Sequence, residues 1–198
     1  MRIVETIDVI SAGSFFRSHQ WKAACRQVKV AVGFTDWPHG TGRFTIRPEK
    51  HGNGVMPIKI PCIRKLKEVG WRTEELPKLP AGVLTTGDLD ALQATPSGNI
   101  GFEWETGNIS SSHRAINKLV LTLHRGGILG GFLVVPSAAL YRYLTDRVGN
   151  IVELRPYFPL WRAMPVKNGC LRIIVVEHDE TSKTVRRIPK GTDGRARR

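Results

Sequence analysis

One seven-residue segment governs the interpretation of this chain: Asn99-Ile100-Gly101-Phe102-Glu103-Trp104-Glu105. Side chains of a β-strand point alternately to its two faces, so a strand here places the three large apolar residues together on one face. Gly101, Glu103 and Glu105 then share the other face, where the glycine has no side chain to block access. Two carboxylates this close raise each other's pKa unless a cation lies between them. Their hard oxygen atoms suit Mg²⁺, Mn²⁺ or Ca²⁺.

Two further acidic residues precede this segment. Asp88 and Asp90 come shortly before it, and residues 94–98 (Ala-Thr-Pro-Ser-Gly) supply a turn between two paired strands. A hairpin would bring Asp90 or Asp88 beside Glu103, so that three carboxylates converge on one cleft. In a basic protein this cluster indicates metal-assisted hydrolysis of a phosphodiester. The alternative is a solvated sheet edge, on which glutamates two positions apart have no chemical role.

The composition predicts one globular domain with a nucleic-acid partner. The chain has 198 residues, a formal net charge of +13 and a pI near 10.2. Seven basic residues and one acidic residue lie in 183–198, so residues 1–182 carry +7 themselves. We expect a single domain over 1–182 and a disordered basic tail over 183–198. A basic domain of this kind is typical of proteins that neutralise phosphates.

Two further features concern the cellular location. Cys25, Cys62 and Cys170 are widely spaced and form no CxxC pair, which favours reduced thiols over a disulfide framework or a zinc site. The chain has no apolar run of the roughly 20 residues that a membrane helix needs. We therefore expect a cytoplasmic protein without a membrane partner.

The apolar periodicity predicts an α/β or α+β fold, with a mixed central sheet flanked by helices. Strands are expected over 1–10, 43–47, 83–92, 99–105, 128–135 and 171–176. Helices are expected over 15–32, 58–69, 110–124 and 138–148. Loops are expected over 35–54, apart from the short strand, and over 73–82, where glycines or prolines recur.

Two segments resemble a known nuclease family. Gly87-Asp88-Leu89-Asp90-Ala91-Leu92 and Ile100-Gly101-Phe102-Glu103-Trp104-Glu105 are similar to the motif strands of PD-(D/E)XK nucleases. The match is to the BamHI/BglII/BstYI-like group of type II restriction endonucleases, in which Glu or Gln replaces the final Lys of the motif. Weaker similarities lie at residues 1–5 and 64–71. The resemblance implies a restriction-endonuclease-like fold and a Mg²⁺ site formed by Glu103 with Asp90 or Asp88. Glu105 would then lie beside the attacking water, which makes Asp90, Glu103 and Glu105 the expected catalytic residues.

Polar residues follow the second motif at the start of an expected helix, whose free N–H groups and dipole suit a phosphate. We predict DNA contacts from Asn108, Ser110, Ser111, Ser112, Arg114 and Lys118. The alternative is that one serine caps the helix while the others are solvated. Arg114 and Lys118, four positions apart, could equally line a dimer interface or a solvated face.

Together these observations predict a type II restriction endonuclease. It would hydrolyse double-stranded DNA at a short palindromic site with Mg²⁺, as a homodimer whose two-fold symmetry matches that of the DNA. Two alternatives stay open. One is a different PD-(D/E)XK nuclease, for repair or a mobile element. The other is a nucleic-acid-binding module without catalysis.

Overall fold

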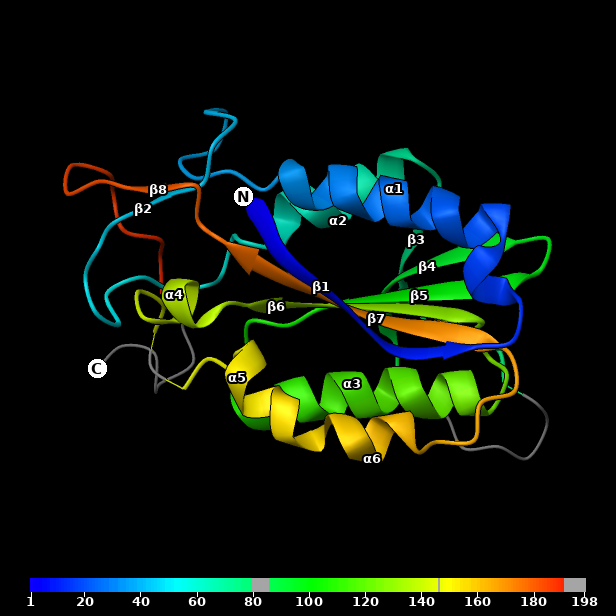
Figure 1. Ribbon diagram of the computed structural model, residues 1–198. Helices are drawn as coiled ribbons and strands as arrows, with labels where there is room; N and C mark the ends of the chain where they lie inside the picture. The colour runs from blue at the N-terminus through cyan, green and yellow to red at the C-terminus, as the bar shows by residue number, and fades with distance from the viewer. Residues whose placement is uncertain (80–85, 146, 191–198) are drawn as a thin grey trace.

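The computed structural model describes residues 1–79, 86–145 and 147–190, and its centre is a six-stranded mixed sheet (Figure 1). The strand order is β1-β7-β6-β5-β4-β3. The parallel strands β5, β6 and β7 form the middle, and antiparallel strands extend the sheet on both sides. The bounds are β1 (Arg2–Ala12), β3 (Arg72–Glu75), β4 (Leu89–Thr95), β5 (Gly98–Trp104), β6 (Gly130–Pro136) and β7 (Gly169–Glu177).

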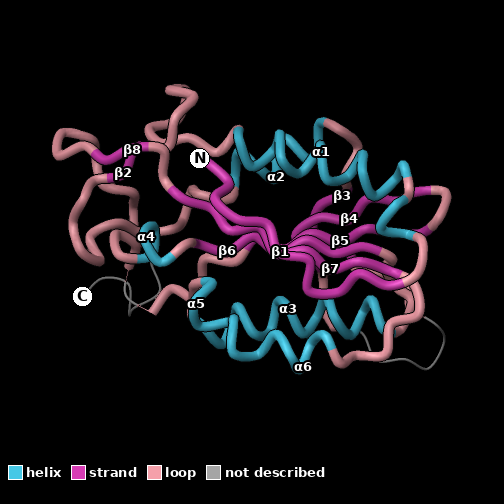
Figure 2. The backbone as a smooth tube through the Cα atoms, in the orientation of Figure 1, coloured by secondary structure: helices cyan, strands magenta, loops and turns pink. Residues whose placement is uncertain are grey.

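Helices cover both faces of the sheet, which gives three layers (Figure 2). One face carries α1 (His19–Gly33) and α2 (Ile60–Glu68). The other carries α3 (Ile109–His124), α5 (Ile151–Leu154) and α6 (Phe158–Arg162). Two 3₁₀ turns, η1 (Phe15–Arg17) and η2 (Arg155–Tyr157), precede α1 and α6, and α4 (Ala138–Tyr141) follows β6. The predicted mixed sheet with flanking helices is confirmed.

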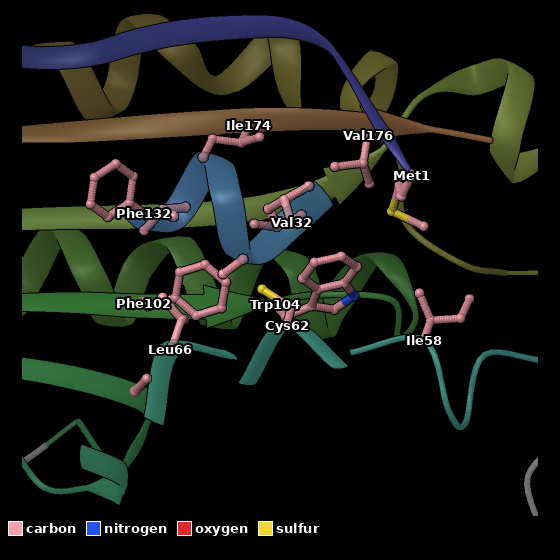
Figure 3. Close-up of a cluster of buried hydrophobic side chains, with 14 of the residues drawn as sticks. Met1, Val32, Ile58, Cys62, Leu66, Phe102, Trp104, Phe132, Ile174 and Val176 are labelled. Atoms are coloured by element: carbon pink, nitrogen blue, oxygen red, sulfur yellow. The ribbon is translucent and has the colours of Figure 1, made fainter. Parts of the chain in front are cut away.

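Each face of the sheet has its own apolar core, because side chains on the strands alternate. Phe102, Trp104 and Phe132 pack toward α1 and α2, in a cluster that includes Val32 and Leu66 (Figure 3). The opposite core joins α3, α5 and α6 to the sheet. The expected division of residues 100–104 between two faces is therefore confirmed.

Gly101 corrects one detail of that prediction. A Cβ atom at this position would lie 2.7 Å from Leu89 Cδ1 and 3.3 Å from Leu119 Cδ2. The glycine therefore lets α3 and its apolar side chains pack closely on the sheet, and it does not open access to the carboxylates. The prediction failed because helices cover both faces of the sheet, so the face that carries Gly101 is buried as well.

Two element predictions are wrong, and the bounds of a third differ. Residues 73–82 are not a continuous loop, since β3 pairs there with β4 at the edge of the sheet. The expected helix over 138–148 ends at Tyr141. The carbonyls of Arg142 and Tyr143 instead accept hydrogen bonds from the backbone N–H groups of His51 and Asn53, so the chain leaves the helix. The strand expected over 83–92 begins at Leu89, and residues 80–85 lie outside the described part.

The first part of the expected tail packs against the domain. A small parallel pair of strands, β2 (Thr45–Ile46) and β8 (Glu180–Thr181), leads into it. Ile188 is buried, and its carbonyl accepts a hydrogen bond from Gly54 N at 2.8 Å. Arg187 forms an ion pair with Glu49 at 2.8 Å. Residues 183–190 therefore differ from a freely solvated tail. Disorder over 191–198 stays a prediction, because those residues lie outside the described part.

Among the helices of the described segments, none combines the length and apolar character required to cross a membrane.

Candidate active site

The β4–β5 hairpin ends at the three predicted carboxylates. Backbone pairing between these strands stops at Ala91 and Phe102, and the carboxylate of Asp90 continues the contact. Its Oδ2 accepts a hydrogen bond from Trp104 N at 2.8 Å, and its Oδ1 accepts one from Lys59 Nζ at 2.7 Å. Asp90 is thus fixed against β5, next to the residues that flank Trp104.

Glu103 points from β5 toward α3 and is only 6% exposed. Its Oε1 forms an ion pair with the ammonium of Lys118, which comes from the second half of α3. That oxygen has no well-directed hydrogen bond within the described part of the chain. Burial raises the pKa of Glu103 to about 7. Lys118 opposes this rise, whereas the negative charges of Asp90 and Glu105 add to it.

Glu105 follows the last residue of β5 and is half-buried. Its backbone N–H donates to Val134 O at 2.9 Å, which holds it beside β6. Its carboxylate accepts a hydrogen bond from Gly107 N at 2.5 Å. Burial raises the pKa of Glu105, the Gly107 N–H lowers it, and the charge of Asp90 raises it further. Asp90 therefore lies close enough to both glutamates for its charge to raise their pKa values.

Asp88 contacts this group through its backbone. It precedes β4, its side chain is exposed, and its backbone carbonyl rather than its carboxylate accepts a hydrogen bond from Lys118 Nζ at 2.5 Å. Of the two aspartates that the sequence left open, Asp90 is the one that belongs to the carboxylate group. In the described segments, no three or more Asp, Glu, His or Cys side chains are grouped so that they could hold a metal ion. Lysine ammonium groups instead contact two of the three carboxylates, those of Asp90 and Glu103.

The start of α3 divides the predicted DNA contacts by exposure. Asn108 is the N-cap, and its side chain accepts a hydrogen bond from Ser111 N at 2.9 Å. Ser110 and Arg114 are exposed. Ser112 is fully buried, and a Cβ on Gly149 would lie 2.3 Å from its Oγ, so packing leaves it no surface for DNA. The sequence suggested a serine cap as one alternative, but the capping side chain is that of Asn108.

Sequence reasoning missed the part that lysines have in this site. Lys59 belongs to the expected basic helix, and nothing in the local pattern indicated that its ammonium contacts Asp90. Lys118 was expected to contact DNA, yet its charge is paired with Glu103. Both contacts are tertiary: Lys59 and Asp90 are brought together by the packing of α2 on the sheet, and Lys118 and Glu103 by the packing of α3.

This geometry agrees with comparisons to known proteins. The family model described as restriction endonuclease BamHI matches residues 1–195. The chain belongs to the BamHI restriction endonuclease family. It is 47% identical over 170 residues to the type II restriction enzyme OkrAI of Oceanobacter kriegii, covering 86% of this chain and 87% of that protein. It is 37% identical over 182 residues to BamHI of Bacillus amyloliquefaciens, covering 88% of this chain and 83% of that enzyme.

The fold is also shared with a more distant solved structure. The crystal structure of the restriction endonuclease BglII in complex with a DNA 16-mer has a TM-score of 0.61 and 10% sequence identity, covering 95% of this chain and 88% of that one. At this identity the similarity shows the fold. Together with the family membership, it confirms the predicted BamHI/BglII-like fold. The protein is a restriction endonuclease, which is a hydrolase that cuts DNA.

Proposed function

We propose that this endonuclease cuts both strands of a short palindromic DNA site with Mg²⁺, at the centre formed by Asp90, Glu103 and Glu105. The observation that supports this most strongly is the group itself. Three carboxylates lie at the ends of two paired strands, the charge of Asp90 raises the pKa of both Glu103 and Glu105, and the more buried of these two glutamates has a pKa of about 7. Such perturbed clusters concentrate at functional sites.

The donor set fits a hard divalent cation. Carboxylate oxygens are the ligands that Mg²⁺ prefers, and Glu103 Oε1 is a buried oxygen without a well-directed hydrogen bond in the described part of the chain. Asp90 and Glu103 would hold the ion. When bound, it would polarise the phosphate, acidify a water and stabilise the leaving alkoxide.

The residues of the chain itself would position the water and the DNA. Glu105 has a raised pKa, which makes its carboxylate a better proton acceptor than an ordinary one, so we assign it to orient and deprotonate the attacking water. Gly107 N–H fixes one oxygen of this carboxylate. Arg114 and Ser110 are exposed on the first turns of α3, where they would contact a DNA phosphate.

A homodimer would present two such sites to the two DNA strands. Large apolar side chains are exposed on the α5–α6 segment, namely Val152, Tyr157 and Leu160, at 54%, 46% and 63%. This segment lies beside α3 (Figure 1), and an exposed group of this kind is typical of a protein interface. We propose that a second copy of the chain covers it.

We also propose a cytoplasmic location. Cys25, Cys62 and Cys170 are all free thiols, and burial raises the pKa of each. Free thiols, of which those of Cys62 and Cys170 are buried, suit a reducing compartment.

Plasmid cleavage tests the proposed function. The wild-type protein with Mg²⁺ should give discrete DNA fragments, and Glu103→Gln should give none. The matched control is Glu68→Gln, at an exposed glutamate of α2, which should cut like the wild type. A smear or nicks alone would indicate a nuclease without palindrome specificity. DNA binding without cleavage in either Mg²⁺ or Mn²⁺ would refute the catalytic role.

A further inference from the structure

The ammonium of Lys118 occupies a position between two oxygen atoms of the site. It forms an ion pair with Glu103 Oε1 and donates a hydrogen bond to the Asp88 carbonyl at 2.5 Å. The side chains of Lys118 and Glu103 are 15% and 8% exposed. Glu103, the carboxylate that we assign to the divalent ion, is therefore already paired with the ammonium of Lys118, and both groups are nearly inaccessible to solvent.

A buried carboxylate needs such a partner. A buried charge without a counter-ion is strongly unfavourable, and removing one member of a buried pair leaves the other uncompensated. A divalent ion bound to Glu103 would lie close to Lys118 Nζ, and the two positive charges would repel each other. Binding of the divalent ion is therefore favoured when the ammonium moves away.

Lys59 offers an internal comparison. It forms an ion pair with Asp90 at 2.7 Å, but its side chain is 47% exposed. Exposed pairs are weak, since water screens them and solvates the freed ammonium. Lys59 can thus leave Asp90 at little cost, whereas Lys118 cannot leave Glu103 so easily.

We propose that Lys118 is a positioning residue that acts as a built-in counter-ion, holding Glu103 in the metal-free enzyme and competing with the divalent ion for it. The proposal rests on the assignment of Glu103 as a metal ligand. It implies that Lys118 weakens metal binding in the absence of DNA. A residue with a merely structural role would have the opposite effect, because its loss would disorder the site.

Calorimetric titration of the DNA-free protein with Mn²⁺ at pH 8.5 tests this competition. Lys118→Met should bind Mn²⁺ about tenfold more tightly than the wild type, because the ion no longer has to displace the ammonium from its buried ion pair with Glu103. Lys118→Arg keeps the cation and should bind no more tightly than the wild type. The matched control Lys65→Met removes an ion pair with Glu68 on α2 and should leave Mn²⁺ affinity unchanged.

A thermal-shift series covers the case in which Lys118→Met is too unstable to titrate. Mn²⁺ should then raise the Tm of Lys118→Met or Lys118→Gln by more than it raises that of the wild type, because the ion replaces the missing charge. Equal or weaker Mn²⁺ affinity and an equal or smaller Tm increase would overturn the proposal. If the Mn²⁺ results overturn the role of Lys118 while the wild type cuts plasmid and Glu103→Gln does not, only the proposal for Lys118 fails. Undiminished cleavage by Glu103→Gln would instead refute the proposed site.

Discussion

Asp90 accepts a hydrogen bond from the backbone N–H of Trp104 at 2.8 Å, at the position where β4 stops pairing with β5. A backbone group that would otherwise lose its partner at the end of the ladder is thereby satisfied by a side chain. The same bond holds the Asp90 carboxylate against Trp104, the residue that separates Glu103 from Glu105 in the sequence. The end of an ordinary hairpin thus becomes a cluster of negative charge.

Asp90→Asn should separate the structural role of this residue from its chemical role. The amide oxygen can still accept from Trp104 N–H, so we expect a Tm within a few degrees of the wild type. The lost charge should reduce the cleavage rate by about 10²-fold or more, the size seen when one group that stabilises a transition state is removed. Asp8→Asn, which removes a surface partner of Arg172, is the control and should cut normally. A fully active Asp90→Asn would contradict the assignment.

The raised pKa of Glu103 predicts how cleavage depends on pH. Glu103 must be ionised to hold a cation, and its pKa is about 7. At low Mg²⁺ the single-turnover rate should therefore rise up to tenfold per unit below pH 7 and level off above it. Higher Mg²⁺ should move the midpoint to lower pH, because the ion competes with the proton. A midpoint that does not depend on Mg²⁺ would argue against Glu103.

The raised pKa of Glu103 affects protein stability in the opposite direction: rising pH should increase cleavage but lower the free energy of unfolding. Glu103 has a higher pKa in the folded protein than in the unfolded chain, so between about pH 4.5 and 7 the folded state binds more protons. Its contribution to the free energy of unfolding therefore falls as pH rises through this window. Urea unfolding of the wild type and Glu103→Gln without metal should show the wild type losing stability relative to the variant from pH 5 to 7. A constant difference would contradict the raised pKa.

Arg114 and Ser112 should behave differently in DNA binding. Arg114→Ala should weaken binding and reduce the slope of log K against log salt by about 0.9, the value for one lost phosphate contact. Ser112→Ala should leave DNA affinity and slope unchanged, since Ser112 is buried against Gly149. Binding titrations on one duplex at several salt concentrations measure both. A larger effect from Ser112→Ala than from Arg114→Ala would place the DNA elsewhere.

Gly54→Ala tests how the end of the described chain is held. A Cβ at Gly54 would lie 1.9 Å from the carbonyl oxygen of Pro189, so the segment around Ile188 would have to shift. We expect trypsin to cut faster near Arg187 in Gly54→Ala. Gly33→Ala is the control, because its Cβ would meet nothing within 4 Å. Equal digestion of the two variants would mean that this packing does not protect the segment.

The fold was predictable where apolar patterns are strong. The buried run that became β6 and the periodic residues of α3 lie close to their expected bounds. β3 was not foreseen, because Arg72–Glu75 is a short, partly exposed edge strand without an apolar pattern. α5 and α6 were missed as well, because each is a short helix and prolines interrupt this part of the chain.

The site was predictable in part for the same reason. The strand alternation placed Glu103 and Glu105 on one face, and the hairpin placed Asp90 or Asp88 beside Glu103 without choosing between them, since both are consequences of local geometry. The contacts of Lys59 and Lys118 come from helices packed on opposite faces, and no spacing in the sequence encodes them. The burial of Ser112 likewise depends on Gly149, which lies far along the chain.

Anomalous diffraction from crystals grown with Mn²⁺ tests the central claim most directly. We expect a peak at about 2.1–2.3 Å from carboxylate oxygens of both Asp90 and Glu103, with Lys118 Nζ moved away from Glu103. A peak bound to other residues, or no peak at Mn²⁺ concentrations that support DNA cleavage, would contradict the account.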